Sequence, residues 1–126
     1  INIKMERKDI DNLEIFQISM HIGQLSYELA HKWEVLQKNT IGYQLIRAAD
    51  SISANISEGY GRFHFKEQRQ FCYIARGSLY ETNTWLTKTK VRIPEDTDKI
   101  DELIMLSHLL LKRLNAYINY IEKRIK

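Results

Sequence analysis

Residues 97–126, TDKIDELIMLSHLLLKRLNAYINYIEKRIK, decide the fold. Apolar residues recur along this stretch at steps of three and four, which is the spacing of an α-helix with one buried face. A proline and a cluster of acids at residues 94–98 come just before it, and acids are favourable at the positive end of a helix dipole. The pattern therefore predicts a long amphipathic helix over residues 97–125. Its predicted buried face comprises Ile100, Ile104, Ser107, Leu111, Leu114, Ile118, Ile121 and Ile125.

Three upstream segments show the same helical spacing, and no useful stretch alternates polar and apolar residues as a half-buried strand does. They predict helices over residues 10–38, 40–58 and 65–92. The connections between these segments are short, and short connections join antiparallel neighbours in helical bundles. The sequence therefore predicts an all-α fold, an antiparallel up-down four-helix bundle that forms a single domain over residues 1–126.

Two glycines and one apolar face predict how these helices end and how they pack. Gly59 follows the second predicted helix, a position typical of a left-handed C-cap. Gly77 lies within the third, where glycine costs about 1 kcal/mol relative to alanine. We therefore expect Gly77 to mark a close approach between the second and third helices. The first helix is expected to bury Ile18, Ile22, Leu25, Leu29, Trp33 and Leu36.

The composition is that of a globular protein, with 44% hydrophobic and 28% charged residues. The longest apolar stretch, residues 103–111, is far shorter than the ~20 residues of a membrane span. Residues 1–8 lack the apolar segment of a signal peptide. The single cysteine, Cys72, cannot form an intrachain disulfide, which agrees with a reducing compartment. We expect a cytoplasmic protein that does not associate with membranes.

No residue pattern in the chain indicates catalysis. The four histidines lie in different segments, and none has a second ligand at the spacing that metal sites use. Cys72 has no evident base near it in sequence and is expected to be a buried, unreactive thiol. We therefore expect a protein that is not an enzyme and that holds no metal and no cofactor.

Polar residues on the second and third helices predict a structural network. Arg47, Asn55, Glu58 and Glu81 lie on helices that their small residues are expected to bring together. Since a buried polar side chain needs a partner, we expect Arg47 or Arg76 to meet Glu58 or Glu81. Asn55 is expected to satisfy backbone groups near the end of the second helix.

Two stripes of arginine and tyrosine are the candidate nucleic-acid surface. The net charge is only +3, but the basic residues concentrate in residues 59–92 and 112–126. Arginine binds phosphates and tyrosine offers a ring face to an unpaired base, so the combination suits single-stranded or looped RNA. Subunit contacts and a solvated surface are the open alternatives, because interfaces are also rich in these residues. The stripes comprise Arg62, Lys66, Arg69, Tyr73, Arg76 and Tyr80, and then Arg113, Tyr117, Tyr120 and Arg124.

The first helix carries a second apolar face, formed by Leu13, Phe16, Met20 and Tyr27 at helical spacing. A helix in a four-helix bundle buries one face in the core. A second apolar face on a soluble protein usually needs a partner. These four residues therefore predict an interface between subunits of a homo-oligomer.

Two motifs resemble a known family. Residues 47–62, RAADSISANISEGYGR, and residues 74–81, IARGSLYE, are similar to the bacterial four-helix-bundle proteins encoded in intervening sequences of large-subunit ribosomal RNA genes. The resemblance covers all four helices. Two positions depart from the family pattern. This chain has Ser53 where the family often has proline, and Ile46 where the family often has arginine. A straighter second helix and a weaker basic site there are the implied consequences.

The resemblance implies a ring of five subunits and no catalysis. It extends to the accessory subunit of diversity-generating retroelements, a basic ring that binds nucleic acid and a reverse transcriptase. Together with the stripes, it predicts a non-enzymatic homo-oligomer that binds RNA. The alternative is a protein-binding scaffold or accessory subunit, for example of a reverse transcriptase, with no direct contact to nucleic acid.

Overall fold

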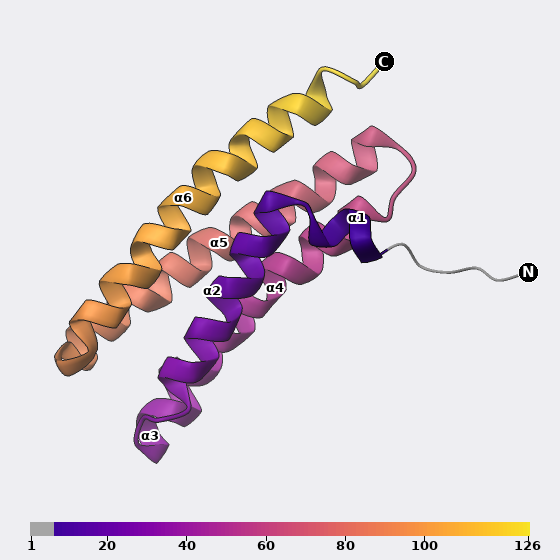
Figure 1. Ribbon diagram of the computed structural model, residues 1–126. Coiled ribbons are helices and arrows are strands. Elements are labelled where there is room, and N and C mark those ends of the chain that lie inside the picture. Colours follow the sequence, from indigo (N-terminus) through magenta and orange to yellow (C-terminus); the bar gives the residue numbers. More distant parts are fainter. Residues whose placement is uncertain (1–6) are drawn as a thin grey trace, which may run out of the picture.

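The structure, a computed structural model, describes residues 7–126, and every regular element in that range is helical (Figure 1). The predicted all-α fold with four long helices is confirmed; residues 1–6 of the predicted domain lie outside the described residues. The elements are α1 (Arg7–Asp11), α2 (Glu14–Ala30), α3 (Val35–Gln37), a π-helix (Lys38–Gly42), α4 (Tyr43–Tyr60), α5 (Phe65–Arg92), a 3₁₀ helix (Pro94–Asp96) and α6 (Thr97–Glu122).

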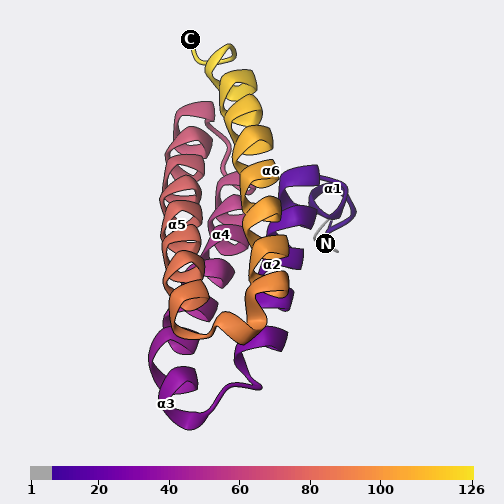
Figure 2. The ribbon, with the colours of Figure 1, turned by 90° about the vertical axis from the view of Figure 1, so that its left-hand side faces the viewer.

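The four long helices pack around one core. Helix α4 packs against α2 and α5, and α6 packs against α5 and α2, so each long helix has two neighbours (Figure 2). Residue numbers rise along α5 as they fall along α6 in the contacts between them, so these two helices run in opposite directions. The contacts are Tyr73 with Glu122, Arg76 with Asn115, Asn83 with Ser107, and Lys90 with Asp101.

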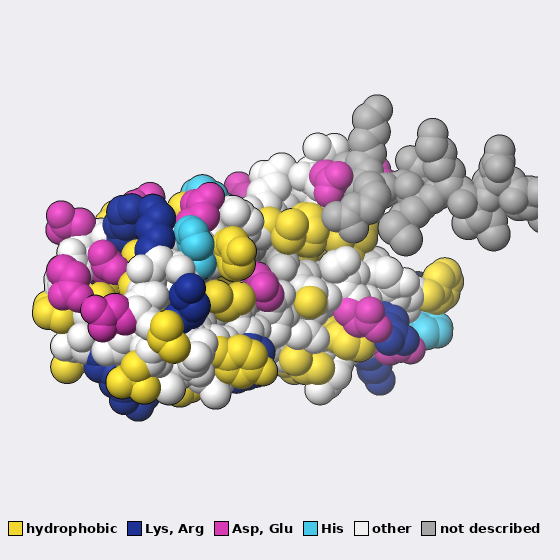
Figure 3. All heavy atoms as spheres, turned by 90° about the horizontal axis from the view of Figure 1, so that it is seen from below, with side chains coloured by type: hydrophobic (Ala, Val, Ile, Leu, Met, Phe, Trp, Pro, Cys, Tyr) yellow, Lys and Arg dark blue, Asp and Glu magenta, His cyan; other side chains and the backbone are white. Residues whose placement is uncertain are grey.

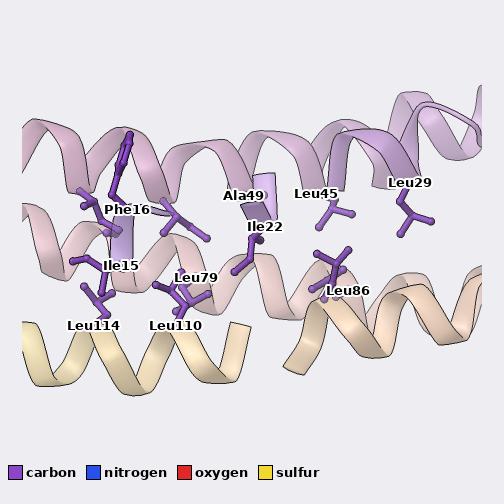
Figure 4. Packing of buried hydrophobic residues seen from close by; sticks show 14 of the residues in the cluster. Ile15, Phe16, Ile22, Leu29, Leu45, Ala49, Leu79, Leu86, Leu110 and Leu114 are labelled. Atoms are coloured by element: carbon purple, nitrogen blue, oxygen red, sulfur yellow. The ribbon is translucent and has the colours of Figure 1, made fainter. Parts of the chain in front are cut away.

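Branched aliphatic side chains from all four helices fill the space between them (Figure 4). Ile22 of α2, Leu45 and Ile52 of α4, Leu86 of α5 and Leu110 of α6 have no exposed surface. Burying one such side chain contributes about 1.5–3 kcal/mol. The core therefore accounts for the helical spacing seen in the sequence.

The predicted helix over residues 10–38 is wrong in extent. The chain leaves α2 after Ala30, and the next helical stretch begins at Val35 and continues through the π-helix into α4. Trp33 explains the break: its buried indole donates a hydrogen bond to Asp96 Oδ2 at 2.7 Å. Leu36, expected on the buried face, is 72% exposed. The burial of the Trp33 ring and its hydrogen bond to Asp96 therefore outweigh the local helical pattern.

The two glycine expectations are also corrected. Gly59 is not a left-handed cap, because no described residue has a positive φ and α4 continues to Tyr60. It lies at the close approach of α4 and α5, where an added Cβ would be 2.8 Å from Phe71 Cβ. An added Cβ at Gly77 would meet nothing within 4 Å. The packing role expected of Gly77 therefore belongs to Gly59.

Both ends of α5 and the beginning of α6 lie where the sequence predicted them. Helix α5 spans Phe65–Arg92, as predicted, and α6 begins at Thr97 but ends at Glu122, three residues early.

Candidate functional site

The α5 stripe faces α6 and forms much of the seam between them. Tyr73 donates a hydrogen bond from its hydroxyl to Glu122 Oε1 at 3.0 Å, which raises the pKa of this phenol. Arg76 donates to Asn115 Oδ1 at 2.9 Å. The guanidinium carbons of Arg69 and Arg76 lie 5.7 and 5.1 Å from the Tyr73 ring centre. These side chains already have partners within the chain.

The remaining α5 stripe residues differ from one another. Arg62 pairs with Glu58 at 2.7 Å and lies 4.9 Å from the Phe71 ring centre. Lys66 is exposed, and Tyr80 is exposed further along the helix. The stripe therefore does not form one continuous exposed surface.

The α6 stripe extends past the beginning of α2. Arg113 Nε pairs with Glu14 Oε1 at 2.9 Å, and Glu14 is the first residue of α2. The following turns of α6 therefore rise above the α2 start (Figure 2). Tyr117, Tyr120 and Arg124 lie on these turns, where α2 no longer flanks the helix.

Tyr117, Tyr120 and Arg124 form a stacked column, hereafter the α6 column. The two tyrosine rings are 6.1 Å apart and inclined by 21°. The Arg124 guanidinium lies 3.5 Å from the Tyr120 ring centre, and its Nη1 donates to the Tyr120 carbonyl at 2.8 Å. Tyr120 is 50% exposed, whereas Tyr117 is partly buried, and burial raises the pKa of its phenol to about 12.

A cavity of about 560 Å³ lies beside this column, between the start of α5 and the end of α6. Arg124 lines the cavity, together with Lys66 and Lys126. Among the described residues that line it, Glu67 is the one with an acidic side chain, and that carboxylate lies 3.7 Å from Arg62. The lining comprises His64, Phe65, Lys66, Glu67, Arg124, Ile125 and Lys126. The structure thus brings the ends of both stripes together around a cationic, partly aromatic site.

The predicted subunit strip on α2 is divided. Phe16 lies in the core and Leu13 packs partly against it, so neither belongs to an exposed strip. Met20 and Tyr27 remain 51% and 52% exposed. One face of the molecule shows small hydrophobic patches interspersed with charged side chains, and the charged side chains are densest at the left-hand end (Figure 3).

Two residues of α4 that the sequence did not single out also matter for the exposed surface and for the packing of α2. Tyr43, at the start of α4, is exposed. Asp50 lies against α2, because a Cβ added at Gly23 would be 2.7 Å from Asp50 Oδ1. Burial raises the pKa of this carboxyl. The glycine at position 23 is the signal that could have placed Asp50, since it leaves room for a side chain from a neighbouring helix.

Residues 11–116 match the family model of the 23S rRNA-intervening sequence proteins. The chain belongs to this family. A crystal structure of a protein of unknown function from the S23 ribosomal protein family, from Bacteroides thetaiotaomicron, has the same fold. It shares 20% sequence identity and a TM-score of 0.72, and the match covers 82% of this chain and 97% of that one. A search of curated proteins found no match.

In this intervening sequence protein, the two motifs that carried the resemblance pack against each other. Arg47 pairs with Glu81, and Glu81 also accepts a hydrogen bond from Trp85 Nε1 at 3.0 Å. Asn55 Nδ2 donates to the Ser51 carbonyl at 2.7 Å. One of the expected pairings, Arg47 with Glu81, therefore appears in the structure. Asn55 does bond a backbone group, but that group is the carbonyl of Ser51 in the middle of α4 and not near the helix end.

The rest of the expected network is arranged differently. Glu58 pairs with Arg62, four residues on, and Arg76 turns towards α6. The Arg47–Glu81 pair is about half exposed, so it contributes little to stability, about 0–1 kcal/mol. Of the four network residues, only Arg47 and Glu81 therefore link α4 to α5, and they do so at the surface.

Titratable groups gather into no metal-binding cluster of three or more within the described part of the chain. Cys72 is buried, and this burial raises the pKa of its thiol to about 11. No described helix of this intervening sequence protein is long and apolar enough to span a membrane.

Proposed function

We propose that this protein is a non-enzymatic, homo-oligomeric, antiparallel up-down four-helix bundle that acts in the cytoplasm and binds RNA. The α6 column carries the proposal. An arginine stacked on tyrosine offers a flat cationic face to bases and donors to phosphates. Membership of a family named for the 23S rRNA intervening sequence supports RNA as the nucleic acid.

The proposed interface is smaller than the sequence stripes. Arg69, Arg76 and Arg113 have partners within the chain, on α6, α6 and α2 respectively. A phosphate would have to compete with these contacts. Lys66, Lys123 and Lys126 are exposed and have no ion pair among the described residues, so they are the cations we assign to phosphate contact.

The test measures RNA affinity against salt concentration. A fluorescent oligoribonucleotide is titrated with the parent protein and with the triple variant Lys66→Gln, Lys123→Gln, Lys126→Gln. Each lost phosphate contact reduces the salt slope by about 0.7–0.9, so the variant should bind more weakly with a shallower slope.

A matched control removes three other exposed lysines, by Lys32→Gln, Lys38→Gln and Lys99→Gln. These positions lie towards the opposite end of the bundle and change the net charge equally. The control should retain most of the parent's slope. Equal losses in both triple variants would contradict the proposed interface, and an absence of RNA binding by the parent would contradict the proposed function.

For assembly, we propose the face of α2 that carries Met20 and Tyr27, and we add the exposed Tyr43 of α4. Exposed apolar and aromatic side chains of this kind are typical of subunit contacts. The ring of five comes from the family resemblance and gives a mass of roughly 75 kDa from a 15.0 kDa chain. Light scattering measures it, and the variant Met20→Lys, Tyr27→Glu should give a smaller, folded species. A parent mass of one chain would contradict assembly.

The same exposed face favours a second candidate function. It is that of a protein-binding scaffold or accessory subunit, for example of a reverse transcriptase, without direct contact to nucleic acid. An intact oligomer whose electrophoretic mobility stays the same with every RNA tested would support this candidate over the first.

A further inference from the structure

We propose that the α6 column and the adjacent cavity form a site for one unpaired nucleotide, with the base on the Arg124 guanidinium and the phosphate between Lys66 and Lys126. This inference rests on the proposed RNA-binding function. It goes further, because it specifies single-stranded or looped RNA and assigns a separate role to each side chain.

The first step is the order of the column. Tyr117, Tyr120 and Arg124 follow one another at steps of three and four, so they succeed one another along the helix axis towards its C-terminal end. One face of the guanidinium covers Tyr120. Its other face is therefore turned away from the Tyr120 ring.

The second step is the position of the cavity. Arg124 belongs both to the column and to the cavity lining. The residue that ends the column thus also lines a space of about 560 Å³, within the ~300–1,000 Å³ range of small-molecule sites, and we assign the free face of its guanidinium to this space. Phe65 and His64 supply further ring surface in the same lining.

The third step is charge. Lys66 and Lys126 line the cavity from α5 and from the chain end, whereas Glu67 is neutralised in part by Arg62. A phosphate between two lysines and a base over a guanidinium match the two parts of a nucleotide.

The fourth step is the requirement for an unpaired base. Bases inside a duplex are stacked on both faces by their neighbours, so they cannot lie on a protein side chain without leaving the helix. A single flat platform therefore selects a strand with a free base. Stacking of this kind is tolerant of sequence, since every base has a flat face.

The experiment uses a short single-stranded oligoribonucleotide with one fluorescent adenine analogue, and the same strand annealed to its complement. The parent should bind the single strand about tenfold more tightly than the duplex and should quench the analogue. Arg124→Lys keeps the charge but removes the plane, so it should lose both the quenching and about tenfold in single-strand affinity while the duplex affinity stays unchanged. Tyr120→Leu should have the same effect, because it removes the support of the guanidinium.

The control is Arg113→Lys, which alters an arginine of the same helix that pairs with Glu14 and stacks on no aromatic ring of the described residues. It should behave as the parent, and circular dichroism verifies that all variants are folded. Equal affinity for both RNAs, or quenching retained by Arg124→Lys, overturns the nucleotide site but leaves RNA binding in place. Failure of the parent to bind either RNA overturns the proposed function and the site with it.

Discussion

Two glycines that look alike in the sequence should respond in opposite ways to alanine. Gly77 lies mid-helix in α5 with no atom within 4 Å of an added Cβ. Gly77→Ala should therefore raise the free energy of unfolding by the full difference in helix propensity between glycine and alanine, about 1 kcal/mol. For a chain of this size, that raises the melting temperature by about 3 °C.

Gly59→Ala should be destabilising. Its Cβ would lie 2.8 Å from Phe71 Cβ and 3.3 Å from the Gln68 carbonyl, and neither atom can move without shifting α5. Overpacking of this kind costs about 1–3 kcal/mol, and the gain in propensity near the helix end is smaller than that. We expect a net loss of about 1–2 kcal/mol.

Urea denaturation followed by circular dichroism measures both effects against the parent. The two sites are separated along the bundle, so the double variant should show their sum. Destabilisation by Gly77→Ala, or stabilisation by Gly59→Ala, would refute the assignment of the close helix approach to Gly59.

Three more predictions concern the core. Ser26→Ala should stabilise the protein by about 1 kcal/mol, because the buried Ser26 hydroxyl has no hydrogen-bond partner among the described residues. Urea denaturation measures this effect, and a loss of stability would contradict it. Phe16→Ala should cost about 3–5 kcal/mol and Met20→Ala less than about 1 kcal/mol, since Phe16 is 6% exposed and Met20 is 51% exposed; equal costs would contradict the division of the α2 strip. The unfolding free energy should fall as the pH rises from 9 to 11, because the Cys72 thiol has a pKa near 9.0 in the unfolded chain and about 11 in the folded chain. Cys72→Ala should reduce this fall. The same dependence of the unfolding free energy on pH in the parent and the variant would contradict the prediction.

Helical spacing was enough to predict the number of long helices and most of the boundaries of α5 and α6. It failed around Trp33, where apolar residues continue at the right spacing but the chain turns. The hydrogen bond from Trp33 to Asp96 joins residues 63 positions apart. The spacing of apolar residues within one segment gives no information about Asp96, so the end of α2 could not be predicted from it.

The candidate site shows the same limit. The sequence predicted that arginine and tyrosine share helix faces, and the structure agrees for Tyr120 and Arg124. It could not show that Arg69 and Arg76 face α6, because helical spacing gives a residue's direction on its own helix but not what lies opposite. Phe16 was assigned to an outer face for the same reason, yet α2 is buried over more than one stripe.

The most direct test of the account is the location of bound RNA on the protein. Ultraviolet cross-linking of the parent protein to a single-stranded oligoribonucleotide, followed by peptide mass spectrometry, identifies the contacted residues. We expect cross-links at Tyr120 and at the cavity residues His64 and Phe65, and we expect them to be lost at high salt. Cross-links confined to Tyr27 and Tyr43, on the exposed α2 and α4 residues assigned to assembly, would contradict it.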